Sequence, residues 1–380
     1  MGRKKYIWQN PDWPKFFWDT NMLLKKIGLA RKAQGKIVGE AAFVGLETHA
    51  DLLVEEAFST SAIEGESLDR SSIRSSVARR LGLPTAGFPP GQRHIDGLVE
   101  MLIDATSNFD KPLSIKRLQS WQASLFPTGY SNIRKIKVGK WRTDREPMRV
   151  ISGPAGKEKI HFEAPLADRI PDEITAFLKW WKHPPENLDG IIRAGIAHFW
   201  FVTIHPFEDG NGRISRAITD MAIAQDEKSS HRLYSLSSQI IKERDVYYEV
   251  LEKSQKQTCD ITMWLDWFLK MYIRAIESSE ETIQKALVIA KFWQLHKSLV
   301  LNDRQIKIVQ KLLEAEPQGF EGGLNNRKYV SMTKTSRETA KRELSDLEGK
   351  GILVRNPGGG RSTSYSLNRN RKVPTLPISQ

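Results

Sequence analysis

Residues 205–213, with the sequence HPFEDGNGR, connect two apolar helical patterns and organise the whole chain. Apolar residues recur at helical spacing in residues 192–200, and the pattern resumes in residues 214–221. Pro206 cannot continue the first helix, and the glycines that follow allow the backbone to turn with positive φ before the second helix begins. We therefore expect a mainly α-helical protein whose two core helices meet at this loop.

Three side chains of the loop suggest a chemical role. His205 ends a buried helix, and a histidine with a near-neutral pKa can take a proton from an attacking hydroxyl. Asp209 offers a hard oxygen ligand for Mg²⁺, which takes one or two carboxylates together with phosphate oxygens. Phe207 is expected to point into the core and fix the loop.

The rest of the loop predicts a phosphate site. The backbone N–H groups of Gly210, Asn211 and Gly212 lie where the second helix begins, so they can bind phosphate oxygens. Arg213 and Arg216 share a helix face and can bind terminal phosphates. The alternative is an ordinary turn between helices. The pattern H-P-F-x-D-G-N-G-R-x-x-R fixes nine of its twelve positions, which favours a functional site over such a turn.

Composition limits the classes of function. The chain has 380 residues, of which 39% are hydrophobic and 27% charged, so it can form two or three domains. Residues 191–207 are the most apolar window, but Arg193 and His198 interrupt it, so we expect no membrane span. The first residues lack the apolar stretch of a secretory signal, so we do not expect export. Cys259 is the only cysteine, which fits the cytoplasm.

Elements on either side of the two core helices are also predicted. Residues 6–20 contain three tryptophans that could bind a ligand, but the favoured interpretation is an aromatic strap that packs over the helices that follow. Residues 21–66 then show one helical pattern. Residues 110–130 look helical. Two extended runs at 149–151 and 159–162 flank SGPAGKE and predict an exposed β-hairpin.

The C-terminal residues predict a winged helix-turn-helix. Asn302 or Asp303 can cap a first helix, residues 335–338 fit a capping box, and extended runs follow at 352–355 and 363–367. Residues 301–380 hold 15 Lys and Arg against 8 Asp and Glu, a surplus of seven within the net charge of +13. The unit could bind DNA or another protein, with the candidate DNA contacts Arg337, Lys341, Arg342 and Arg361.

The loop matches the core motif of the Fic family at His205, Pro206, Phe207, Asp209, Gly210, Asn211, Gly212, Arg213 and Arg216. The resemblance implies a helical domain that transfers AMP from ATP to a hydroxyl side chain of a target protein and releases pyrophosphate. It makes His205 the base, Asp209 the Mg²⁺ ligand, and the glycines, Asn211 and the arginines the phosphate site. Some relatives use other phosphate-bearing donors or substrates.

The resemblance extends to three further elements. A target with a Ser, Thr or Tyr hydroxyl would dock on the 149–162 hairpin as an added strand, although an ordinary surface hairpin is the alternative. Tyr247 and Tyr248 resemble adenine-side residues, of which at most one can stack on the base because neighbours on a helix face different ways. Dimerisation is expected from the same resemblance.

Residues 60–65, TSAIEG, resemble the inhibitory motif of Fic proteins of the second class. Thr60 and Glu64 share a helix face, and Gly65 is a natural helix end. The resemblance implies that Glu64 pairs with Arg216 and keeps the enzyme off. In other relatives a glutamate here orients a hydrolytic water and removes AMP, which is the alternative. We expect four parts: an N-terminal domain at 1–105, the catalytic domain at 106–275, a linker helix at 276–300 and the winged helix at 301–372.

Overall fold

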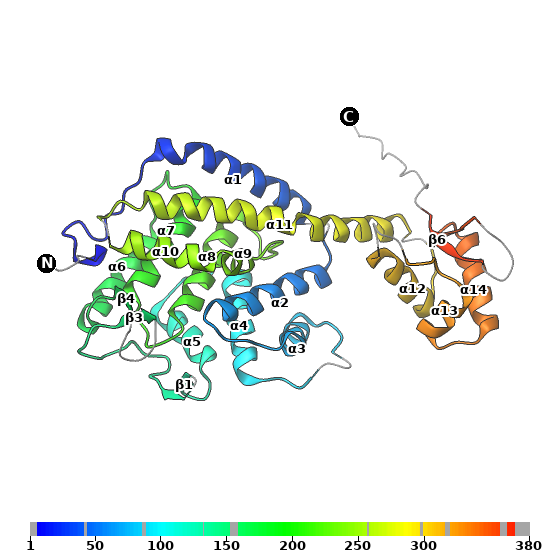
Figure 1. Cartoon of the computed structure of the whole chain (residues 1–380), viewed down its shortest axis with the longest axis horizontal. Coiled ribbons are helices and arrows are strands. Elements are labelled where there is room, and N and C mark those ends of the chain that lie inside the picture. Colours follow the sequence, from blue (N-terminus) through cyan, green and yellow to red (C-terminus); the bar gives the residue numbers. More distant parts are fainter. Residues whose placement is uncertain are drawn as a thin grey trace. The chain divides into compact units, whose positions relative to one another are not determined.

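The structure is a computed structural model (Figure 1) that describes residues 6–41, 44–85, 89–131, 133–152, 159–256, 258–296, 299–315, 320–357 and 363–368. The chain divides into two compact units, one of Met1–Ala42 and Leu46–Glu280 and one of Phe43–Gly45 and Glu281–Gln380. Both are mainly helical. Within the ranges given, no helix combines the length and apolar composition that a membrane span requires.

The first unit contains eleven α-helices, two 3₁₀ helices and two small hairpins among its described residues. In chain order these are η1 (Ile7–Gln9), α1 (Thr20–Ala41), α2 (Leu46–Ile63), α3 (Arg70–Leu81), α4 (Arg93–Ser107), α5 (Ile115–Leu125), β1 (Tyr130–Ser131), β2 (Arg134–Lys135), β3 (Arg149–Ser152), β4 (Lys159–Glu163), η2 (Ala167–Arg169), α6 (Ile170–Lys182), α7 (Gly190–Ile204), α8 (Asn211–Glu227), α9 (Leu236–Lys242), α10 (Arg244–Gln255) and α11 (Thr262–Leu295). Helix α11 continues past Glu280 into the second unit.

Helices α7 and α8 form the centre of the first unit, as the apolar patterns predict. Asp189 caps α7 by accepting the N–H groups of Ile191 and Ile192 at 2.9 and 3.1 Å. Nearly every side chain of α7 is buried, as expected of a helix that is apolar on all sides. Helix α8 packs along α7, and α4 and α5 pack on α8. The central pair therefore forms a rigid support for the loop between them.

Two predicted helices are shorter in the structure. Residues 21–66 form α1 and α2 instead of one helix, and Gly45, a poor helix former, immediately precedes α2. Residues 110–130 yield only α5, because Ser114 caps its start by accepting the N–H of Arg117. At the other end, Gly129 with φ of 80° turns the chain into β1.

The predicted hairpin at 149–162 is confirmed. Strands β3 and β4 pair antiparallel, with a register shift between Val150 and Ile151, and we call this hairpin the flap. Its connecting residues 153–158 lie outside the described residues. A second small hairpin, β1–β2, was not predicted from the sequence.

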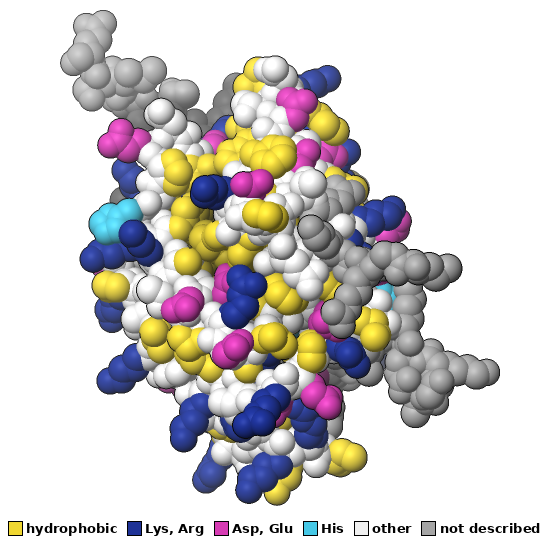
Figure 2. Space-filling model, turned by 90° about the vertical axis from the view of Figure 1, so that its left-hand side faces the viewer, with side chains coloured by type: hydrophobic (Ala, Val, Ile, Leu, Met, Phe, Trp, Pro, Cys, Tyr) yellow, Lys and Arg dark blue, Asp and Glu magenta, His cyan; other side chains and the backbone are white. Residues whose placement is uncertain are grey.

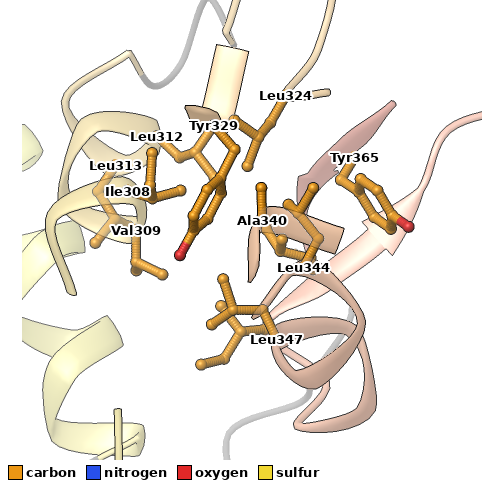
Figure 3. Packing of buried hydrophobic residues seen from close by; sticks show 12 residues of the cluster. Ile308, Val309, Leu312, Leu313, Leu324, Tyr329, Ala340, Leu344, Leu347 and Tyr365 are labelled. Atoms are coloured by element: carbon orange, nitrogen blue, oxygen red, sulfur yellow. The ribbon is translucent and has the colours of Figure 1, made fainter. Parts of the chain in front are cut away.

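The second unit packs three helices against a hairpin. These are α12 (Asp303–Glu314), α13 (Asn326–Thr333), α14 (Arg337–Gly349), β5 (Leu353–Arg355) and β6 (Tyr365–Leu367). Apolar side chains of α12 and α14 converge on the buried Tyr329, whose hydroxyl donates to Glu343 at 2.8 Å (Figure 3).

The predicted cap at Asn302 is confirmed, but α14 starts one residue later than the sequence indicates. Ser336, and not Thr335, caps this helix by accepting the N–H of Thr339.

Candidate active site

The loop at 205–213 opens into a cavity with a volume of about 710 Å³. This volume is in the range of small-molecule sites. Four separate parts of the chain line it: the loop and the start of α8, the flap, one face of α10, and the end of α2. The lining includes His205, Asp209, Gly210, Asn211, Gly212, Glu64, Phe162, Tyr247 and Tyr248. The structure thus brings together residues as far apart in the sequence as Glu64 and Tyr248.

Buried groups hold the loop in one conformation. Phe207 is fully buried, as predicted, and its ring lies 4.6 Å from that of Trp141. The Asn211 side chain accepts the N–H of Phe207 and donates to its carbonyl, both at 2.9 Å. These bonds hold the amide of Asn211 against Phe207, and its backbone N–H at the start of α8 is a group that can bind an anion. Gly210 has φ of 90° and begins α8, so glycine is favoured there.

His205 is arranged as a proton acceptor. It ends α7 in the left-handed region, with φ of 51°, and its Nδ1 lies 3.2 Å from the carbonyl of Val202. A carbonyl only accepts, so Nδ1 carries the proton and Nε2 keeps a lone pair. Burial lowers the pKa of His205 to about 4, and the positive charge of Arg142 acts in the same direction. The imidazole is therefore neutral at pH 7.

Arg142 is a buried residue of the site that sequence reasoning missed. Its Nε donates to the carbonyl of His205 at 2.8 Å, its Nη2 to the carbonyl of Pro165 at 2.5 Å, and its backbone N–H to Pro206 at 3.0 Å. Burial lowers the pKa of Arg142 to about 10. One side chain therefore joins the loop at 205–213 to the end of the flap. An arginine whose partners are carbonyls leaves no signal in the sequence.

The donor set at Asp209 fits Mg²⁺. Its carboxylate lines the cavity, and 37% of the side chain is exposed. One oxygen accepts the N–H of Gly210 at 2.5 Å, and the other accepts the hydroxyl of Ser131. No cluster of three acidic, His or Cys side chains exists in the described part of the chain. A single carboxylate that faces open space suits an ion whose other ligands are phosphate oxygens and water.

Arg216 is held by the end of α2, as the inhibitory motif predicts. Its Nε donates to the Thr60 hydroxyl at 2.7 Å, and its Nη2 donates to the Thr60 carbonyl at 2.9 Å and to Glu64 at 2.7 Å. The carbonyl is available because the Glu64 N–H bonds to Ser61 instead. Gly65, with φ of 82°, then ends the helix. Although Arg216 is buried, the negative charge of Glu64 raises its pKa.

A second ion pair beside the first was not predicted. Arg213 donates to Glu66 at 2.8 Å and lies 5.0 Å from the ring of Phe126. Neither Arg213 nor Arg216 lines the cavity, whereas Glu64 does. A Cβ at Gly212 would lie 2.2 Å from the Glu64 carboxylate, so the glycine lets Glu64 reach the loop. Glu64 thus lines the cavity while it binds Arg216, and Glu66 binds Arg213.

Tyr247 and Tyr248 both line the cavity, and only Tyr247 is buried. The Tyr247 hydroxyl donates to Nε2 of His198 at 3.0 Å, since Nδ1 of this histidine donates to Thr219. The Tyr248 hydroxyl lies 3.4 Å from the carbonyl of Ile63, at the end of α2. Arg244 donates to the same carbonyl at 2.8 Å. Helix α10 therefore holds the end of α2 as well as lining the cavity.

Comparison with known proteins agrees with this geometry. Residues 112–223 match the Fic/DOC family, and residues 6–83 match a domain of unknown function, DUF4172. The chain is 31% identical over 90 residues to the protein adenylyltransferase Fic-1 of Caenorhabditis briggsae. This match covers 24% of the chain and only 16% of the relative.

Two solved structures share the fold. One is a Fic family protein from Desulfovibrio desulfuricans, with a TM-score of 0.60 and 17% identity over 94% of this chain and 99% of that one. The other is a signalling protein with a Fic domain from Bacteroides thetaiotaomicron, with a TM-score of 0.50 and 15% identity over 70% of this chain and 98% of that one. The chain therefore contains a Fic/DOC family domain at residues 112–223.

Proposed function

We propose that this protein transfers AMP from ATP to a hydroxyl side chain of a target protein. The observation that carries the proposal is the cavity that joins a neutral His205, the open N-terminus of α8 and the Asp209 carboxylate. Backbone N–H groups at a helix start bind phosphate oxygens, and a neutral imidazole accepts a proton. The Fic/DOC domain and the similarity to a protein adenylyltransferase support the same reaction.

The reaction needs one proton acceptor and one phosphate cradle. The target hydroxyl oxygen attacks the α-phosphorus of ATP, and its proton passes to Nε2 of His205. A new bond forms between this oxygen and phosphorus, the bond to the bridging oxygen breaks, and pyrophosphate leaves with the electron pair. The N–H groups of Asn211 and Gly212 would hold phosphate oxygens in place, and that of Gly210 would join them on release from Asp209. Mg²⁺ bound at Asp209 would neutralise phosphate charge.

The flap is the proposed docking site for the target. Its two strands line the cavity opposite the loop, and an added strand would bring a hydroxyl close to His205.

The end of α2 would keep the enzyme inactive. Glu64 and Glu66 bind the two arginines that the terminal phosphates of ATP would need. ATP bound with these arginines occupied would lack the contacts that orient its α-phosphorus for in-line attack. Removing Glu64 frees Arg216 and should raise transfer.

Labelled ATP tests the reaction. The Glu64→Gly protein should incorporate label from ATP marked at the α-phosphate and none from ATP marked at the γ-phosphate. Wild type should incorporate less, and Glu64→Gly with His205→Ala should incorporate none. Incorporation of the γ-label would instead indicate phosphate transfer and refute the proposal.

Removal of AMP is a second candidate, favoured by the position of Glu64. Its carboxylate lines the cavity beside Gly212, and 31% of the side chain is exposed, so it could orient a water molecule toward a bound AMP ester. AMP-modified protein incubated with wild type and with Glu64→Gly separates the two reactions. Loss of AMP with wild type alone supports removal, and stable AMP with both proteins rejects it.

DNA binding by the second unit is a candidate of another class. We propose that α12, α13, α14 and the β5–β6 hairpin form a winged helix-turn-helix. Helix α14 carries Arg337, Lys341 and Arg342, all exposed, which suits insertion into a major groove. Arg361 lies outside the described residues. A gel shift that weakens steeply with salt and persists in His205→Ala would support binding, and no shift at low salt would refute it.

A further inference from the structure

The flap has little support of its own. Its two strands form a separate sheet, and the described residues add no third strand to it. An isolated two-stranded hairpin is only marginally stable in water. Something else must therefore hold it where a target strand could pair with it.

The N-terminal aromatic segment contacts the flap directly. We call residues 6–13 the strap. The indole N–H of Trp8 donates to the carbonyl of Glu163 in β4 at 2.6 Å, and the Tyr6 ring packs edge-on against Phe162 at 5.4 Å. Trp8, Phe162 and Ala164 form a buried apolar cluster, which Met148 completes from the flap side. The sequence predicts a strap over helices, and the structure adds the flap to its contacts.

The strap and the cavity share the same flap residues. Phe162, Met148 and Val150 pack against the Trp8 cluster and also line the cavity. Any shift of Trp8 therefore changes the wall that faces His205. Figure 2 looks onto the side where the N-terminus and the flap lie in Figure 1, and hydrophobic side chains gather across this face.

The strap is itself anchored to the rigid core. Trp13 donates its indole N–H to Glu173 of α6 at 2.7 Å, and Arg169 binds the same carboxylate at 2.7 Å while lying 5.4 Å from the Trp8 ring. Beyond the strap, Phe16 packs against Trp200 of α7 at 5.5 Å. The strap is therefore linked to α6 through Trp13 as well as to the flap through Trp8.

We propose that Trp8 is a positioning residue that holds the flap in the conformation a target strand needs, and this rests on the function proposed above. The strap lies in the region that matches a domain of unknown function, at residues 6–83. The same region carries Glu64 and Glu66, so it would affect the site in two ways. The strap supports target docking, and the end of α2 restrains ATP.

Hydrogen exchange and AMP transfer together test the proposal. Trp8→Ala and Trp8→Phe are made in the Glu64→Gly protein, with Trp293→Ala in the second unit as the matched control. We expect Trp8→Ala to speed amide exchange in 148–152 and 159–163 and to lower transfer by about tenfold, through the lost indole bond and packing. Exchange in α7 and α8 and the affinity for ATP should stay unchanged. Trp8→Phe, which keeps a ring, should have a smaller effect.

Two results would overturn the proposal. One is unchanged flap exchange in Trp8→Ala, and the other is an equal rise across α7 and α8, which would mean a general loss of stability. The proposed function fails separately, through absence of AMP transfer in the Glu64→Gly protein itself, and flap exchange would still test the role of Trp8.

Discussion

The ion pair between Glu66 and Arg213 predicts a measurable restraint on ATP binding. The two side chains meet at 2.8 Å, with Arg213 8% exposed and Glu66 42% exposed. In the proposed reaction, a phosphate of ATP would compete with Glu66 for this arginine. A partly exposed pair of this kind is worth up to about 1 kcal/mol, because solvent screens the exposed partner. That energy corresponds to about a fivefold change in affinity.

The assay is calorimetric titration of ATP into a protein that binds but does not react. In the Glu64→Gly, His205→Ala background, Glu66→Gln should tighten ATP binding by about fivefold. Glu55→Gln is the matched control, because Glu55 lies on α2, is 34% exposed and pairs with Arg70 at 2.7 Å, and neither residue lines the cavity. Equal affinities for Glu66→Gln and its background would refute the reasoning, as would an equal gain from Glu55→Gln.

Two other predictions concern the loop. Because burial lowers the pKa of His205 to about 4, transfer by the Glu64→Gly protein should be level from about pH 5.5 to 8 and fall only near the folded pKa, as the base becomes protonated. A rate profile with its midpoint near 6.5 would contradict this. Asn211→Ala should lower the free energy of unfolding by roughly 2 kcal/mol, because the buried backbone groups of Phe207 lose both partners. Urea titration measures it, and a loss below about 0.5 kcal/mol would show that the bonds contribute little.

Much of the site could be predicted because its residues lie close together in the sequence. The residues of the loop between Pro206 and Gly212 dictate a helix end, a turn and a helix start, and these local rules hold in the structure. The flap followed from two extended runs around turn formers. The pair of Thr60 and Glu64 depended on helix spacing and a resemblance, and their contacts with Arg216 agree with it.

The unpredicted parts depend on contacts between distant segments. Nothing in the sequence around Arg142 indicates that it is buried, because its partners in the loop and at the end of the flap are distant in the chain. Trp8 could be placed in a strap, but nothing local indicates that its indole meets Glu163. The pairing of Glu66 with Arg213 could have been predicted from the sequence. Glu66 follows Glu64 by two residues, and Arg213 lies one helical turn before Arg216, the partner of Glu64.

We propose that the loop moves AMP from ATP to the target and that Glu64 restrains this transfer. The most direct measurement is the intact mass of the Glu64→Gly protein after incubation with ATP and Mg²⁺. The account predicts a gain of one AMP unit, a smaller modified fraction in wild type, and no gain when His205→Ala is added. An unchanged mass in Glu64→Gly, or the same gain without His205, would contradict it.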